Sequence, residues 1–196
     1  MTADSPTSSG EGEGPLLVVI DMQRLFGPGT PWATPGFDSL FQPIGRLVDG
    51  FGDRICFTRF VVPAHLEGSW VDYYREWEFA TRPEAVALHE LAAPLAERAR
   101  GHLVVDKPSF CKMGPELRAA AGASETLVVC GVATDCCVIA TVIDAADSGM
   151  HVRVVADACA GATAEAHERA VAIMAGFAPQ VRITNVDDEL ALAAAG

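Results

Sequence analysis

Short runs rich in Val, Leu and Ile alternate with helical patterns along this 196-residue chain. Strands that are buried on both faces have continuous apolar runs, so the alternation predicts an α/β fold with a mostly parallel sheet. We therefore expect a three-layer α/β/α sandwich with six strands. The expected strands are Leu16–Ile20, Arg54–Thr58, His102–Val105, Thr126–Cys130, Val152–Val155 and Val181–Thr184.

Helical spacing of apolar residues between these runs predicts the covering helices. The first is expected from Asp38, a candidate N-cap, with Pro43 tolerated only because it lies near the first turns. The segment 60–82 instead concentrates five aromatic residues without clean periodicity, so a loop is expected, whose rings either line a pocket or cover the core. The other expected helices are Glu84–Arg100, Asp135–Ser148, Ala164–Ala175 and Asp187–Ala195.

Length and composition indicate one domain over residues 15–196, because half of the residues are hydrophobic and can build a sizeable core. Met1 to Gly14 contain almost no apolar side chain and are expected to form a disordered tail. We find no signal-peptide pattern and no apolar run near the ~20 residues that span a bilayer. The chain is therefore expected to be soluble and cytoplasmic, with no membrane partner.

Charge and cysteine usage narrow the partners further. The net charge is −12 and no basic stripe offsets it, which argues against nucleic acid as a partner. The six cysteines lie mostly in apolar runs and lack the regular spacing of a secreted disulfide scaffold, so a reducing compartment is expected.

The run 127–138 carries the strongest chemical signal. It reads as a buried strand that breaks at Gly131 and restarts as a helix with Cys136 and Cys137 in the first turn. A helix N-terminus lowers the pKa of a thiol and can hold an oxyanion, so a nucleophilic cysteine is the leading hypothesis.

Two further reactive residues follow predicted strands. Asp21 comes directly after the first strand and Lys107 soon after the third. The carboxyl ends of parallel strands form the ligand crevice, so both residues should meet Cys137 there. Each alone has an ordinary structural interpretation, but together they supply a base, a cation and a soft nucleophile for covalent acyl transfer.

Four motifs resemble the isochorismatase-like cysteine hydrolases, a family that includes nicotinamidase, N-carbamoylsarcosine amidohydrolase and isochorismatase. The motifs are Val-Val-Ile-Asp-Met-Gln-Arg-Leu-Phe (18–26), Asp-Lys-Pro (106–108), Gly-Val-Ala-Thr-Asp-Cys-Cys-Val (131–138) and Val-Val-Ala-Asp-Ala-Cys-Ala (154–160). The resemblance runs from about Pro15 to about Leu190 and implies a Rossmann-like, isochorismatase-like hydrolase fold.

The resemblance also implies roles for individual residues. Asp21, Lys107 and Cys137 would form a catalytic triad. The peptide bond between Val132 and Ala133 would be cis, and the amides of Ala133 and Cys137 would form the oxyanion hole. Members of this family are commonly dimers or tetramers, so a homo-oligomer is expected.

The adjacent thiols require a choice. Neighbouring side chains on a helix point ~100° apart, so only one thiol can face the other two groups. The family motif places the nucleophile at Cys137, and Cys136 is then expected to be a packing residue.

Two departures from relatives indicate the reaction. Nicotinamidases resemble one another in an Asp-x-His that binds a metal, and this chain has Phe60 and Val62 at those positions. His65 alone is no site, because zinc needs three or four ligands, so neither a metal nor another cofactor is expected. True isochorismatases cleave a vinyl ether and lack the cysteine, so retention of Cys137 favours C–N hydrolysis.

The interpretation from sequence is thus a metal-independent cysteine amidohydrolase that cleaves a small amide, ureido or carbamoyl compound through a thioester. The alternatives are an isochorismatase-type ether hydrolase and a non-catalytic binding protein. The resemblance places Phe26 and Trp77 in the substrate pocket. Arg59, at a strand end, either clamps a substrate carboxylate or forms a surface salt bridge, and the sequence leaves both open.

Overall fold

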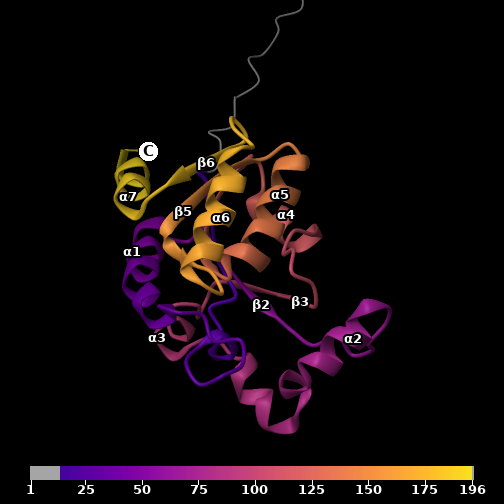
Figure 1. Ribbon diagram of the computed structural model, residues 1–196. Coiled ribbons are helices and arrows are strands. Elements are labelled where there is room, and N and C mark those ends of the chain that lie inside the picture. The colour runs from indigo at the N-terminus through magenta and orange to yellow at the C-terminus, as the bar shows by residue number, and fades with distance from the viewer. Residues whose placement is uncertain (1–13, 196) are drawn as a thin grey trace, which may run out of the picture.

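A six-stranded parallel sheet forms the centre of the protein (Figure 1), as the alternating pattern predicts. The computed structural model describes residues 14–195, so the expected tail Met1–Gly14 lies outside the described residues except for Gly14. The strand order is β3-β2-β1-β4-β5-β6, so the order reverses between β1 and β4, where ligands bind in such sheets. The strands are β1 Leu16–Ile20, β2 Ile55–Phe60, β3 Leu103–Lys107, β4 Thr126–Val132, β5 His151–Ala160 and β6 Val181–Thr184.

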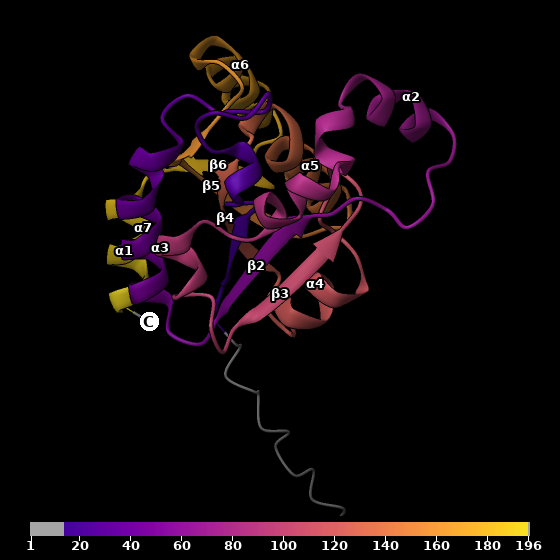
Figure 2. The ribbon, with the colours of Figure 1, turned by 90° about the horizontal axis from the view of Figure 1, so that it is seen from below.

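Helices cover both faces of this sheet, which confirms the predicted α/β/α architecture. In Figure 2, α1, α3 and α7 lie on one side of the strands, and α4 and α5 lie on the other. α1 packs against α7, and α5 packs against α6. The helices are α1 Phe41–Phe51, α2 Ser69–Glu76, α3 Ala93–Ala96, α4 Pro115–Ala121, α5 Ile139–Asp147, α6 Ala164–Ala175 and α7 Val186–Ala195. Within residues 14–195, none of these has both the length and the apolar composition that crossing a bilayer requires.

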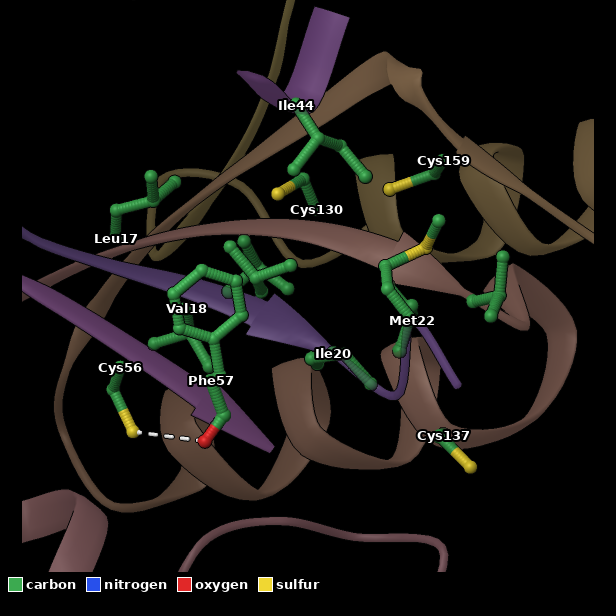
Figure 3. Close-up of a cluster of buried hydrophobic side chains, with 14 of the residues drawn as sticks. Leu17, Val18, Ile20, Met22, Ile44, Cys56, Phe57, Cys130, Cys137 and Cys159 are labelled. Carbon is green, nitrogen blue, oxygen red and sulfur yellow. Dashed lines mark hydrogen bonds between the residues drawn. The ribbon is translucent and has the colours of Figure 1, made fainter. Parts of the chain in front are cut away.

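The core is centred on β1, whose five residues are all buried (Figure 3). The buried thiols within it behave as small hydrophobic groups. Burial, with a smaller contribution from the charge of Glu116, raises the pKa of Cys56 to about 12, and burial raises the pKa of Cys159 to about 12. These two thiols therefore stay protonated and are poor nucleophiles.

The expected helix Glu84–Arg100 is wrong. The chain forms a 3₁₀ segment, Pro83–His89, then an extended stretch, and only then the short α3. The extended stretch pairs with the residues after β1: the Arg24 amide donates to the Glu90 carbonyl at 3.0 Å, and the Ala92 amide donates to the Met22 carbonyl at 2.8 Å. These bonds need extended backbone, so long-range pairing overrides the local helical pattern.

Other differences are smaller. The aromatic segment 60–82, expected as a loop, contains α2 and a 3₁₀ turn. α4 was not predicted, because its seven residues are too short to show periodicity. The helix expected from Asp135 instead starts with one π-helical turn, Thr134–Val138, before α5. The helix expected at Ala164–Ala175 is confirmed with the same bounds.

Gly131 fixes the end of β4 against β1. Its φ is +112°, and a Cβ there would lie 2.1 Å from the backbone oxygen of Ile20. Only glycine permits both this conformation and this close approach. The bend that follows leads directly into the turn with the two thiols.

We predict that Gly131→Ala destabilises the protein severely, because the backbone of β1 would have to move. Gly29→Ala is the matched control: Gly29 also has a positive φ, +86°, but a methyl group there would meet nothing within 4 Å. The control should lose only the ~1–3 kcal/mol of an unfavourable φ. Denaturant unfolding measures both, and equal losses would show that the contact with Ile20 is not limiting.

Candidate active site

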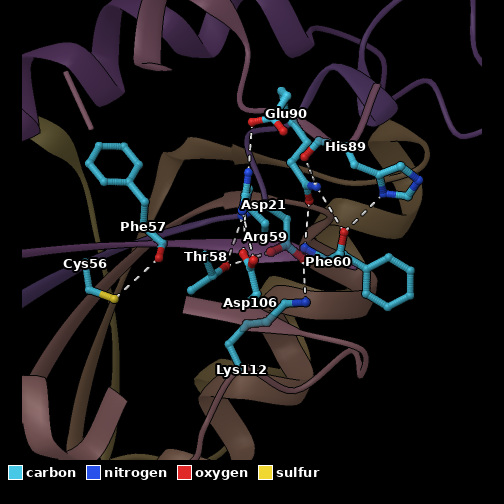
Figure 4. Close-up of polar contacts among 11 residues, drawn as sticks. Asp21, Cys56, Phe57, Thr58, Arg59, Phe60, His89, Glu90, Asp106 and Lys112 are labelled. Atoms are coloured by element: carbon cyan, nitrogen blue, oxygen red, sulfur yellow. Dashed lines mark hydrogen bonds and ion pairs between the residues drawn. The ribbon is translucent and has the colours of Figure 1, made fainter. Parts of the chain in front are cut away.

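Asp21 lies at the end of β1 and has no exposed surface. Three contacts hold it in place. Its Oδ1 accepts a hydrogen bond from the Thr58 hydroxyl at 2.6 Å, and its amide donates to the same hydroxyl oxygen at 3.2 Å. Its Oδ2 lies 2.8 Å from Lys112 Nζ (Figure 4). Among residues 14–195, Asp21 alone of the non-glycine residues has a positive φ, 48°. Such strain is typical of functional positions.

Lys112 is equally buried and lies on the segment that follows β3. Its Nζ donates to the Ser109 carbonyl at 2.9 Å and lies 4.9 Å from the centre of the Phe60 ring. Its amide donates to the Thr141 hydroxyl at 2.9 Å, and that hydroxyl donates to the Cys137 carbonyl at 2.7 Å. The side chain thus contacts Asp21, while the backbone is linked to the turn that carries Cys137.

The structure corrects the expected role of Lys107. The cation beside Asp21 is Lys112, and among the described residues Lys107 forms no ion pair with Asp21. Lys107 ends β3, two strands away from β1, and its ammonium lies against Gly114. Neighbouring strands are ~4.8 Å apart, so the backbone of a residue on β3 lies ~10 Å from the backbone of β1. The segment after β3 returns across the strand ends and brings Lys112 to Asp21 instead.

Gln23 is a supporting residue that the sequence reasoning missed. It is fully buried, its Nε2 donates to the Phe60 carbonyl at 3.0 Å, and its Oε1 accepts from the Phe60 amide at 2.7 Å. This pair of bonds ties the end of β2 to the chain just after Asp21.

The turn around Cys137 has an unusual backbone. The peptide bond between Val132 and Ala133 is cis, at the position that the family resemblance implies. The carbonyl of Ala133 accepts hydrogen bonds from the amides of Cys136 and Val138, which flank Cys137. π-helical turns of this kind occur frequently at functional sites.

Residues at and just before the start of α6 contact the same turn through hydrogen bonds. The Thr134 hydroxyl and His167 Nδ1 are 2.8 Å apart, and Asp135 Oδ1 accepts from the Ala162 amide at 2.9 Å. The turn is therefore held by α5 and Lys112 on one side and by α6 on the other.

Cys137 is 2% exposed. The hydrogen bond with the Cys136 thiol, burial and the charge of Asp21 raise the pKa of Cys137 well above its usual value, while the Lys112 ammonium acts in the opposite direction. Cys137 therefore rests as a neutral thiol and needs a base at the moment of reaction. The Asp21 carboxylate, close enough to affect its pKa, can supply one.

A cavity of about 280 Å³ opens onto the thiols. Phe26 and Trp77, which the sequence assigns to the substrate pocket, both line it, and Arg59 does not. Trp32, which the sequence reasoning missed, lies among them, and its only sequence signal was an aromatic ring within a Gly- and Pro-rich segment. The lining residues are Phe26, Pro31, Trp32, Ala33, Thr34, Phe60, Tyr73, Trp77, Phe110, Ala133, Cys136, Cys137 and Ala162.

Of the two interpretations of Arg59 that the sequence left open, the structure shows the surface salt bridge. Its guanidinium makes two bonds of 2.8 Å to Asp106, its register partner on β3, and another of 2.8 Å to Glu90. Side chains alternate along a strand, so Arg59 lies on the face of β2 opposite Thr58, which bonds Asp21, while its guanidinium bonds Asp106 and Glu90 (Figure 4). The expectation that Arg59 contacts substrate is therefore wrong.

No group of three or more His, Cys, Asp or Glu side chains in the described part of the chain could hold a metal ion. At the two positions where nicotinamidases carry ligands, Phe60 is buried under Lys112 and Val62 packs against the core.

Comparison with known proteins identifies the family. The model of the Isochorismatase domain matches residues 15–185, so the chain belongs to this family of hydrolases, which confirms the resemblance. No curated protein is significantly similar to it.

Solved structures share the fold. A cysteine hydrolase from Pseudomonas syringae pv. phaseolicola 1448A is 19% identical with a TM-score of 0.79, over 96% of this chain and 99% of that one. An isochorismatase family protein from Desulfovibrio vulgaris subsp. vulgaris str. Hildenborough is 26% identical with a TM-score of 0.73, over 90% and 97%. Pyrazinamidase of Pyrococcus horikoshii, in complex with zinc, is 24% identical with a TM-score of 0.65, over 87% and 98%.

We predict that Lys112→Met destabilises the protein by ~3–5 kcal/mol, because it leaves the buried Asp21 carboxylate without its counter-charge. Lys107→Met, the matched control on the same segment, should cost less than ~0.5 kcal/mol. Adding Asp21→Asn to Lys112→Met should recover part of the loss. Denaturant unfolding measures all of these variants, and a larger loss for Lys107→Met would reverse the correction.

Proposed function

We propose that the protein is a metal-independent cysteine amidohydrolase that cleaves a C–N bond of a small amide, ureido or carbamoyl compound. The observation that carries the proposal is the buried Asp21–Lys112 ion pair, whose charges act on the Cys137 thiol, together with the cavity of about 280 Å³ that this thiol lines. These groups supply a base, a fixed cation and a nucleophile in one place.

The first half-reaction forms a thioester. Asp21 takes the proton of Cys137 as the sulfur attacks the carbonyl carbon of the substrate. The developing oxyanion is bound by the amides of Ala133 and Cys137, and in comparable sites one such donor contributes ~3 kcal/mol. Lys112 holds the Asp21 carboxylate in position, because its ammonium lies 2.8 Å from it.

The second half-reaction regenerates the enzyme. Asp21, now protonated, donates its proton to the departing amine, and the C–N bond breaks. A water molecule then enters, Asp21 removes a proton from it, and the hydroxide attacks the thioester carbon. The carboxylic acid leaves, and the proton on Asp21 returns to the sulfur of Cys137.

Cys137 rather than Cys136 is assigned as the nucleophile. The charges of Asp21 and Lys112 act on both thiols, and the hydrogen bond between the two thiols lowers the pKa of Cys136 while it raises that of Cys137. The assignment therefore rests on the position of Cys137 in the family motif and on its carbonyl, which is tied to the Lys112 segment through Thr141. Cys136 is less buried and lines the cavity from the same turn.

Replacing the two thiols separately tests this assignment. We predict that Cys137→Ala lowers amide hydrolysis by orders of magnitude, whereas Cys136→Ser retains most of it. Rapid acid quenching of the wild-type protein during turnover should show an acyl mass on the peptide that contains both residues, and the mass should persist in Cys136→Ser. Persistence in Cys137→Ala instead would assign the chemistry to Cys136.

Chelation tests the metal-independent part of the proposal. Exhaustive dialysis against a strong chelator should leave the rate of ammonia release unchanged, because Asp21 provides the base and backbone amides bind the oxyanion. Loss of activity that zinc or iron restores would contradict the proposed mechanism.

A further inference from the structure

The cavity above the thiols has no charged wall. None of its lining residues is Asp, Glu, Lys, Arg or His. Six of them are aromatic residues and one is a proline. Asp21 and Lys112, whose charges act on the Cys137 thiol, are fully buried and paired with each other. The Asp135 carboxylate accepts from the amide of the lining residue Ala162 at 2.9 Å, and its negative charge would repel an anion. Arg59, near the end of β2, is paired with Asp106 and Glu90 outside the cavity, and Lys107, at the end of β3, does not line the cavity either.

A charged ligand would therefore be desolvated here without a counter-charge. Moving an unpaired ion from water into such surroundings is strongly unfavourable. The net charge of −12 further repels anions approaching from solution. A neutral ligand avoids both penalties and gains from the burial of its apolar surface.

Trp32 is positioned to bind the apolar part of such a ligand. Its ring stacks on Phe26 at 6.0 Å with an interplanar angle of 14°, and it meets Tyr73 at 5.8 Å and Trp77 at 6.0 Å. The segment that carries it is anchored, because the Thr34 amide donates to the Phe26 carbonyl at 2.9 Å. The indole is thus held in place before any ligand arrives, which reduces the entropy cost of binding.

The remaining polar groups of the wall are uncharged. The Tyr73 hydroxyl and the Thr34 hydroxyl have no hydrogen-bond partner among the described residues, and both residues line the cavity. Burial first, and then the charges of Cys136, Tyr74 and Cys137, raise the pKa of Tyr73, which therefore remains a neutral donor near the thiols. One or two neutral hydrogen bonds can fix the orientation of a ligand in such a pocket.

We propose that this site selects compact, uncharged substrates whose flat apolar group lies against Trp32, and that it discriminates against carboxylated ones. Trp32 is then a specificity-determining residue. This inference rests on the proposed function only in treating the bound ligand as a substrate. The selectivity is a property of the cavity, and it can be measured without turnover.

Alkylation of Cys137 measures the charge selectivity directly. Iodoacetamide and iodoacetate have nearly the same shape and differ in charge, and free glutathione provides the intrinsic ratio of their rates. In a Cys136→Ser background, the ratio of iodoacetamide to iodoacetate at Cys137, followed by peptide mass, should exceed the glutathione ratio at least tenfold. The excess should persist in ~1 M salt, where long-range fields are screened within ~3 Å. A ratio equal to that of glutathione would overturn the proposal.

Substitution of Trp32 measures its contribution. N-phenyl iodoacetamide should react faster than iodoacetamide at Cys137, again relative to glutathione, because its ring can lie against the indole. Trp32→Leu should remove most of this advantage. Trp70→Leu is the matched control, since Trp70 belongs to the same aromatic cluster but does not line the cavity. Equal effects of the two substitutions would exclude a specific role for Trp32.

Turnover separates this inference from the proposed function. 4-Nitrobenzamide and 4-carbamoylbenzoate are nearly isosteric, and only the second is charged. Preference for 4-nitrobenzamide by at least tenfold in kcat/KM supports both proposals. Equal hydrolysis of the two would overturn the selectivity and leave the amidohydrolase proposal intact. Selective alkylation of Cys137 without hydrolysis of any amide in a broad panel would support the charge selectivity and overturn the amidohydrolase proposal.

Discussion

The buried ion pair between Asp21 and Lys112 is the interaction on which the rest of the site depends. Neither side chain has exposed surface, and the two charged atoms are 2.8 Å apart. Removing two charges from water costs several kcal/mol per ion, and only close pairing with further hydrogen bonds offsets it. Those bonds come from the Thr58 hydroxyl and the Ser109 carbonyl. Such a pair is weak evidence for stability, and its position at the strand ends favours a chemical role.

The backbone around this pair is arranged to bring the thiol to it. Asp21 adopts a positive φ directly after β1, and Gly131 allows β4 to approach β1 closely just before the thiol turn. Thr141 then links the backbone of Lys112 to that of Cys137. The carboxylate, the ammonium and the thiol therefore come from three separate segments that are coupled through buried hydrogen bonds. A displacement of any one segment would be felt by the other two.

The sequence predicts most of the fold, because parallel strands have continuous apolar runs that are visible without knowing their neighbours. Asp21 was predicted because it directly follows such a run, and Cys137 was predicted because it lies in the turn after another run and the family motif selects it over Cys136. Lys107 was assigned by the same reasoning, and it failed there because the path of a loop across the sheet edge is a tertiary feature. Lys112 is only five residues further along, and nothing local distinguishes it from Lys107.

Other errors have similar causes. The helix expected at Glu84–Arg100 is interrupted by pairing with residues after β1, a contact over more than sixty positions that no local pattern reveals. The two interpretations of Arg59 could have been separated, because alternation along β2 places it on the face opposite Thr58. Trp32 had no periodic context at all, so only the assembled cluster of rings shows its place in the cavity.

Asp21, Lys112 and Cys137 are expected to act as one unit in this site. A double-mutant cycle on the rate of Cys137 alkylation by iodoacetamide, with Asp21→Asn, Lys112→Met and the combined variant, tests this most directly. We expect the effects to be strongly non-additive, with a coupling of at least ~1.4 kcal/mol, which is a tenfold difference in rate. Additive effects in this cycle, or strong coupling in the same cycle built with Lys107→Met, would contradict the claim.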